Sequence, residues 1–89
     1  MKQAELLIVN KLGLHARSSA KLVSLAKSFA SDIKLTRDGN EVDGKRIMNV
    51  LMLAAPAGTS LTLTVSGADE DAAFDALKNL IEDGFGEEI

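Results

Sequence analysis

The sequence contains one histidine, His15, in a segment whose residue types suit phosphate chemistry. It follows Gly13 and Leu14 and stands directly before a helical pattern that begins at Ala16. The first backbone N–H groups of a helix have no partner within the helix and carry partial positive charge, so they bind anions well. A neutral imidazole nitrogen can attack a phosphoryl group, and the planar guanidinium of Arg17 can bind two phosphate oxygens together. If His15 caps this helix, we expect a phosphate on or near the imidazole, with the amides of Ala16 and Arg17 beside it.

Ser18 and Ser19 could add hydroxyl groups to this phosphate site, although local capping of the helix start is their simpler role. One alternative stays open, in which His15 is a half-exposed capping residue and Arg17 and Lys21 are ordinary surface charges. Other chemistries find less support. A lone histidine without cysteine lacks the spacing of a metal site, and the chain contains neither a Gly-x-Ser-x-Gly turn nor a nucleotide-binding glycine loop. We therefore expect no metal and no cofactor.

The composition is that of a small acidic protein without cysteine. Its 89 residues, 46% of them hydrophobic, suit a single domain that spans positions 1–89. A net charge of −3 and an aromatic content limited to three Phe argue against nucleic-acid binding. No apolar run approaches the roughly 20 residues of a membrane span, and Glu5 stands too early for a secretory signal. We expect a cytoplasmic protein that does not bind membranes directly.

Charge is distributed unevenly along the chain. Residues 10–27 include four basic side chains and no acid, whereas residues 69–89 include eight acids and only Lys78 as a base. The first segment therefore predicts a basic patch around His15. We interpret the acidic end as a solvated helix face followed by a frayed tail.

Hydrophobic periodicity predicts the elements that must position the histidine. Strands are expected at 4–9, 32–36, 41–43 and 60–66, and helices at 16–30, 47–55 and 69–81. Asp69 is a candidate cap for the last helix, and Gly84 should end it. The resulting order, βαββαβα, predicts an α+β open-faced sandwich in which a four-stranded antiparallel sheet has three helices on one face. On the short middle helix, one face should consist of Ile47, Val50, Leu51 and Ala54, with Met48 and Met52 pointing away from it.

The run Gly13-Leu14-His15-Ala16-Arg17, on a chain of this length and element order, resembles HPr, the histidine-containing phosphocarrier family of the bacterial phosphoenolpyruvate-dependent phosphotransferase system. Residues 10–12, 44–48 and 57–59 and the acidic last helix extend the resemblance over essentially the whole chain. The resemblance implies that His15 accepts a phosphoryl group on Nδ1 from enzyme I and passes it to an enzyme IIA domain, assisted by Arg17. Such a protein is a carrier without turnover of its own, and we expect a monomer.

The resemblance also implies a surface for docking these partner proteins, on the first helix and the short middle helix. Its apolar residues, called the docking surface below, are Ala16, Ala20, Ile47, Met48 and Leu51, and Lys21, Lys45 and Arg46 form its basic rim. Methionine suits contacts with several partners. For Met48 a place in a second core face stays open as the alternative.

The sequence departs from the family pattern at two positions. Ser18 stands where the family usually has proline, which predicts a slightly less rigid helix start with function retained. Arg46 stands where many members, especially from Gram-positive bacteria, have a serine that a kinase phosphorylates. Because arginine cannot accept that group, this regulation is not expected, and the added positive charge favours acidic partners.

Two other functions compete with sugar phosphotransfer. One is a regulatory HPr homologue of the nitrogen branch, whose phosphorylation state controls binding to soluble regulators. The other is a small phosphate-handling hydrolase similar in size to acylphosphatases. The hydrolase would need a second group that positions water, and the sequence places none beside Arg17.

Overall fold

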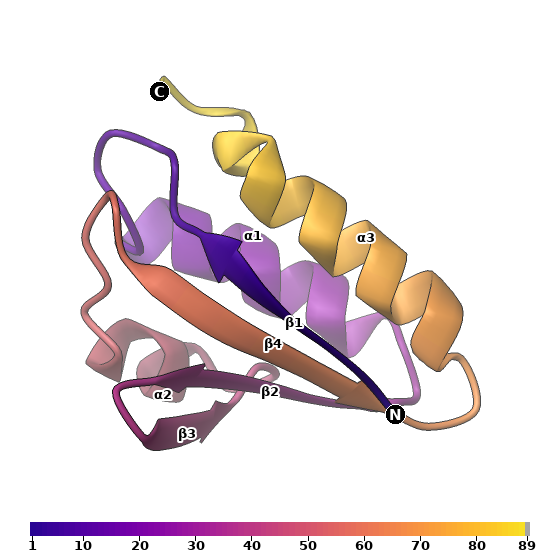
Figure 1. Ribbon diagram of the computed structural model, residues 1–89. Helices are drawn as coiled ribbons and strands as arrows, with labels where there is room; N and C mark the ends of the chain where they lie inside the picture. The colour runs from indigo at the N-terminus through magenta and orange to yellow at the C-terminus, as the bar shows by residue number, and fades with distance from the viewer. Residues whose placement is uncertain (89) are drawn as a thin grey trace.

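Four strands and three helices follow one another in the expected order βαββαβα, which confirms the predicted α+β class (Figure 1). The computed structural model describes residues 1–88. Its elements are β1 (Lys2–Leu7), α1 (Ala16–Lys27), β2 (Asp32–Arg37), β3 (Asn40–Asp43), α2 (Ile47–Met52), β4 (Ser60–Ser66) and α3 (Glu70–Glu82), followed by a short 3₁₀ helix, η1 (Gly84–Gly86). The strands form one antiparallel sheet in the order β1-β4-β2-β3. Within residues 1–88, no helix has both the length and the apolar character needed to cross a bilayer.

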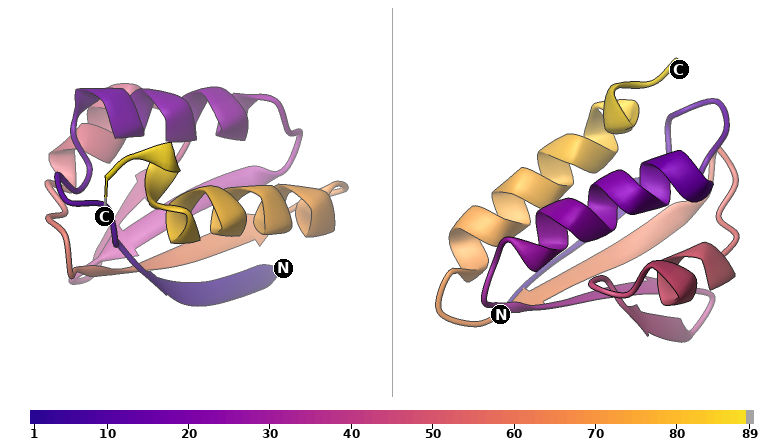
Figure 2. Two further views of the ribbon diagram at one scale, coloured as in Figure 1. Left: turned by 90° about the horizontal axis from the view of Figure 1, so that it is seen from above. Right: turned by 180° about the vertical axis from the view of Figure 1, so that it is seen from behind.

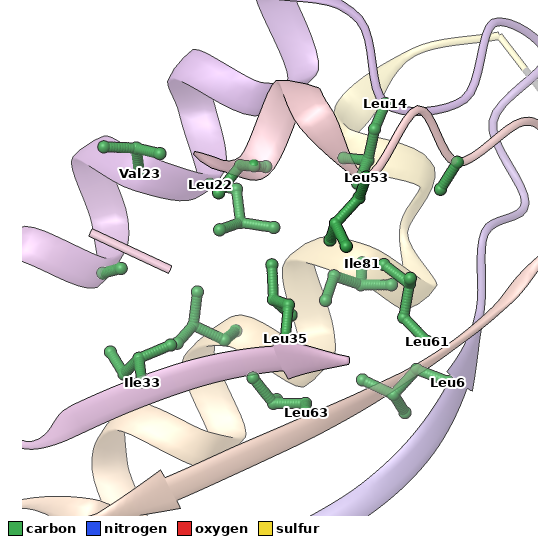
Figure 3. Close-up of a cluster of buried hydrophobic side chains, with 14 of the residues drawn as sticks. Leu6, Leu14, Leu22, Val23, Ile33, Leu35, Leu53, Leu61, Leu63 and Ile81 are labelled. Atoms are coloured by element: carbon green, nitrogen blue, oxygen red, sulfur yellow. The ribbon is translucent and has the colours of Figure 1, made fainter. Parts of the chain in front are cut away.

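The helices lie on one side of the sheet, as Figure 2 shows for α1 and α3, and the core fills the space between the two layers. In β4, Leu61, Leu63 and Val65 are buried while the threonines between them are half-buried, because successive side chains of a strand point to opposite faces. Leu61 pairs with Leu6 of β1, and Leu63 pairs with Leu35 of β2. These leucines point toward Leu22 of α1 and Ile81 of α3 (Figure 3). Each fully buried leucine contributes about 1.5 to 3 kcal/mol to folding.

The boundaries of β1, α1 and α2 differ from the prediction by more than one residue. β1 occupies residues 2–7, because Lys2 and Gln3 pair with Val65 and Thr64 at the far end of β4 although their side chains are polar. Backbone pairing depends little on side-chain polarity, so hydrophobic patterning missed this extension. α1 ends at Lys27, three residues before the predicted end. Ser28 caps it with its backbone N–H, and its hydroxyl donates to the Leu25 carbonyl oxygen at 2.6 Å.

The buried face of α2 also differs from the predicted one. Val50 is fully buried as expected, but the next buried residue is Leu53, the C-cap, while Ile47 is 39% exposed and Ala54 is exposed. The prediction assumed a helix that continues to residue 55. Instead the helix ends at Met52, and Ala54 adopts a φ of 49°. The 100° spacing of a helix therefore does not predict where the Ala54 side chain points.

Asp69 occupies the N-cap position of α3, but its side chain makes no capping hydrogen bond. Its carboxylate accepts hydrogen bonds from the backbone N–H groups of Ala30 and Ser31, at 2.8 and 2.9 Å, and from the Ser31 hydroxyl. The predicted cap is therefore a clamp between α3 and the turn that joins α1 to β2. These bonds, with the Ser31 hydroxyl first, hold the pKa of Asp69 below its usual value. The predicted end of α3 at Gly84 is confirmed, since Asp83 is the C-cap and Gly84 has a φ of 68°.

Candidate functional site

His15 is the N-cap residue of α1. Its backbone is extended, with φ −119° and ψ −173°, and its carbonyl oxygen accepts the first intrahelical hydrogen bond from Ser19 N–H at 2.9 Å. The Nδ1 atom of the ring lies 3.3 Å from the backbone nitrogen of Arg17, whose N–H it accepts. The side chain is 30% exposed, so a partner can reach it from solvent. The imidazole therefore lies at the positive end of α1, with Nδ1 beside the unpaired amides.

Ser18 is buried and caps the helix start. Its hydroxyl accepts a hydrogen bond from the backbone N–H of His15 at 3.0 Å and donates one to the Gly13 carbonyl oxygen at 2.8 Å. The His15 side chain and the Ser18 hydroxyl thus cap the helix start reciprocally, which contributes about 1 kcal/mol to the stability of the helix. Because both hydroxyl contacts lie within the loop, Ser18 offers a phosphate its backbone amide and not its hydroxyl. Ser19 is buried as well.

The loop before His15 is held against the segment between α2 and β4. Leu14 packs in the core, and its backbone N–H donates to the Ala55 carbonyl oxygen at 2.8 Å. Gly13 has a φ of 67°, and a Cβ atom there would lie 2.4 Å from the same oxygen, so only glycine fits. The buried Asn10 donates from Nδ2 to the Gly13 carbonyl oxygen at 2.8 Å. These contacts determine where the polypeptide enters α1 and thus where the imidazole lies.

Glu87 contacts the other side of the imidazole, which the sequence did not predict. His15 Nε2 lies 2.9 Å from Glu87 Oε1 and 3.1 Å from Oε2, and Asn10 Nδ2 donates to Oε1 at 3.0 Å. The Glu87 side chain is only 12% exposed. The hydrogen bond with His15, more than the one from Asn10 or the positive charge of Lys21, holds the pKa of Glu87 below its usual value. The carboxylate is therefore charged where it meets the ring.

The expectation of a frayed acidic tail is wrong for residues 84–88, and residue 89 lies outside the described part. Phe85 is buried with a φ of 60°, between two glycines that also have positive φ. Lys21 Nζ donates to the Phe85 carbonyl oxygen at 2.7 Å, and Lys11 N–H donates to the Glu88 carbonyl oxygen at 2.8 Å. This segment thus returns toward the loop between β1 and α1 (Figure 1). A lone aromatic residue between glycines was the signal in the sequence, since it suggests a buried anchor in a tight turn.

A shallow depression surrounds His15. Its lining includes two cations, Arg17 and Lys21, and two carboxylates, Glu87 and Glu88. Ala16 and the exposed Leu12, which the sequence interpretation did not select, add apolar surface. Within residues 1–88, no carboxylate pairs with the guanidinium of Arg17, so this group can bind an incoming anion. The depression combines a nucleophilic ring nitrogen, helix amides and a cation, which is what phosphoryl transfer requires.

The residues of the docking surface lie on two adjacent helices. Ala16 and Ala20 are exposed on α1, Ile47 and Met48 are exposed on α2, and Leu51 is partly buried. Met48 is 67% exposed, so the alternative of a second core face is wrong.

The three residues of the basic rim do not lie together. Lys21 lies beside the depression, but Lys45 Nζ donates to the Phe29 carbonyl oxygen at 2.8 Å, just past the C-terminal end of α1. Arg46 pairs with Asp43, with 3.6 Å between Nε and Oδ2. A helix of 12 residues is about 18 Å long, so Lys45 is remote from His15.

Comparison with known proteins identifies relatives over the full length of the chain. The family described as PTS HPr component phosphorylation site matches residues 2–83. The phosphocarrier protein HPr of Cupriavidus necator is 54% identical over 87 residues, 98% of each chain. That of Xylella fastidiosa strain 9a5c is 46% identical over 88 residues, 99% of each chain.

Solved structures agree with these relatives. The crystal structure of HPr-C-His from Thermoanaerobacter tengcongensis has a TM-score of 0.96 at 42% identity and covers 100% of both chains. The crystal structure of an HPr dimer from the same organism has a TM-score of 0.78 at 41% identity, over 98% of this chain and 100% of that one.

Proposed function

The chain belongs to the HPr family of phosphocarriers of the phosphotransferase system, and from this premise we propose that His15 accepts a phosphoryl group from phosphorylated enzyme I and passes it to an enzyme IIA domain. One observation carries the assignment. The imidazole caps α1 with Nδ1 at 3.3 Å from the Arg17 amide nitrogen, and it is open to solvent. A phosphoryl group on Nδ1 would therefore be formed beside the positive end of the helix.

The transfer step forms one bond and breaks one. The Nδ1 lone pair attacks phosphorus, the Nδ1–P bond forms, and the bond from phosphorus to the donor breaks with its electron pair leaving on the donor. The negative charge on the phosphoryl oxygens is offset by the α1 amides, including those of Ala16, Arg17 and Ser18, and by the Arg17 guanidinium. The depression is open, so the acceptor can approach, and the phosphoryl group can be transferred from Nδ1 to the acceptor by the same kind of step.

We propose that both partners bind the docking surface. The exposed Met48 suits two partners of different shape, because its unbranched thioether adapts to varied surfaces. Lys21 beside His15, together with Lys45 and Arg46 at the start of α2, favours acidic partner surfaces through long-range attraction.

We further propose that the protein works as a monomer in the cytoplasm, where phosphoenolpyruvate is available. Both layers of the fold are built from one chain, which supports this state. Light scattering after gel filtration should give the mass of a single chain. A mass of two chains across the working concentration range would contradict the monomer.

The carrier function is tested by incubating the protein with enzyme I and phosphoenolpyruvate and measuring its mass. We expect the mass of one added phosphoryl group, labile in acid and stable in base, and no addition to His15→Ala. Addition of enzyme IIA should discharge the wild-type adduct. An adduct that persists in His15→Ala, or an unmodified wild type, would contradict the assignment. Discharge only to a soluble regulator, with enzyme IIA inert, would favour the nitrogen-branch function instead.

A further inference from the structure

Glu87 is the one acidic side chain in direct contact with His15 within residues 1–88, and the phosphoryl chemistry above gives it no task. It stands 72 positions later in the chain and reaches Nε2, the ring nitrogen opposite the proposed nucleophile. We propose that Glu87 is a positioning residue, which holds the ring proton on Nε2 so that Nδ1 keeps its lone pair, and which offsets the positive charge that the ring acquires when Nδ1 binds phosphorus.

The tautomer follows from the partners of the two ring nitrogens. A backbone N–H can only donate, so Nδ1 accepts from Arg17 N–H and carries no proton. A carboxylate can only accept, so Nε2 carries the proton and donates to Glu87. The two contacts reinforce one another, since a proton on Nδ1 would lose both of them. The neutral ring is thus fixed in the form whose lone pair lies at the helix N-terminus.

The carboxylate is held firmly enough to orient the ring. Both oxygens approach Nε2, at 2.9 and 3.1 Å, and Oε1 also accepts from Asn10 Nδ2 at 3.0 Å. Asn10 is fully buried, and its other Nδ2 contact is the Gly13 carbonyl oxygen, in the loop that leads to His15. The buried Phe85 anchors the segment that carries Glu87. Asn10 therefore joins the loop before the histidine to the carboxylate behind it.

Charge is the second part of the role. When Nδ1 bonds to phosphorus and the proton stays on Nε2, the ring becomes cationic, and the Glu87 carboxylate lies against that proton. With only 12% of the side chain exposed, water screens the pair weakly. Arg17, Lys21 and Glu88 also line the depression. Glu88 is exposed and lies beside Lys11, with 3.9 Å between Lys11 Nζ and Glu88 Oε1. Glu87 is thus the only anion within residues 1–88 that contacts the ring.

Three variants separate these effects. Glu87→Gln keeps an oxygen that can accept from Nε2 but removes the charge, whereas Glu87→Ala removes both. Glu82→Gln removes the same charge from an exposed position on α3 that does not line the depression, and it is the matched control. Nitrogen-15 NMR of the ring, at a pH where the imidazole is neutral, reports the tautomer without any partner protein. Initial rates of phosphorylation by enzyme I report the step.

We expect wild type, Glu82→Gln and Glu87→Gln to carry the ring proton on Nε2, and Glu87→Ala to show a mixture of both tautomers. Phosphorylation should slow about tenfold in Glu87→Gln and further in Glu87→Ala, and should stay within about twofold in Glu82→Gln. The urea midpoint of each variant shows that it remains folded.

The expected change in phosphorylation rate rests on the proposed function, whereas the expected tautomer does not. The proposed function and the role of Glu87 can therefore fail separately. A wild type that is never phosphorylated would contradict the proposed function. The role of Glu87 would be overturned if Glu87→Ala kept the wild-type tautomer and was phosphorylated at the rate of Glu82→Gln.

Discussion

Replacing Gly13 with alanine tests how the loop before His15 is held. At a φ of 67°, a residue with a Cβ atom loses about 1 to 2 kcal/mol relative to glycine. The new Cβ would also lie 2.4 Å from the Ala55 carbonyl oxygen and 2.8 Å from the Pro56 Cα, where ordinary contacts begin at 3.4 Å. Both neighbours are backbone atoms, so a loop must move by roughly 1 Å, which is overpacking at a cost of about 1 to 3 kcal/mol.

That movement also disrupts the 2.8 Å hydrogen bond from Leu14 N–H to the Ala55 carbonyl oxygen, which contributes about 1 kcal/mol. We therefore expect Gly13→Ala to lower the free energy of unfolding by about 3 to 6 kcal/mol, a large part of the stability of a domain of this size. Phosphorylation of His15 should fall too, measured under conditions where the variant is still folded, because the displaced loop carries the imidazole.

Urea denaturation followed by circular dichroism measures the loss, and Gly39→Ala is the matched control. Gly39 has a φ of 82°, but a Cβ atom there meets nothing within 4 Å. In this control, the free energy of unfolding should fall only by the backbone contribution of about 1 to 2 kcal/mol. Equal losses in the two variants would refute the reasoning, because the close contact at Gly13 would then contribute nothing.

Three further outcomes are expected. Phe85→Ala should lower the free energy of unfolding by about 3 to 5 kcal/mol, measured by urea denaturation, because it empties a buried site. NMR should also show the loss of the contact between Glu87 and His15. A decrease below about 1 kcal/mol would contradict the anchoring role of Phe85. The pKa of Asp69 is lowered in the folded state, so its carboxylate stabilises the fold fully above the usual pKa of 3.8. This stabilisation disappears as the pH falls through the lowered pKa of the folded state. Urea midpoints between pH 6 and pH 2 should therefore fall less for Asp69→Asn than for wild type, and parallel curves would count against the clamp. Met48→Asp should leave the free energy of unfolding within about 0.5 kcal/mol of wild type, since the side chain is exposed. Transfer of the phosphoryl group to enzyme IIA should slow about tenfold. An unchanged transfer rate would show that Met48 is not part of the docking surface.

The fold was predictable where its signals are local. Leu61, Leu63 and Val65 alternate with threonine, and this period of two identified both the strand and its buried face. The helix start at His15 was equally readable, because capping involves residues only two or three positions apart. Local patterns failed at α2, since its buried face depends on where the helix stops, and the left-handed backbone at Ala54 is not visible in a hydrophobic pattern.

The partners of the polar side chains depended on tertiary structure. Asp69 was correctly placed at a helix start, but its carboxylate binds the Ala30 and Ser31 amides, 39 and 38 positions away in the sequence. Glu87 was assigned to a solvated tail and instead contacts His15, 72 positions away.

The sequence alone determined that an imidazole stands at the positive end of a helix beside an arginine. Only the packing of the C-terminal segment around Phe85 brought a carboxylate to the other side of that imidazole. The reason is physical: a helix cap is formed by neighbours in the chain, whereas a hydrogen-bond partner across the fold exists only after distant segments have packed together.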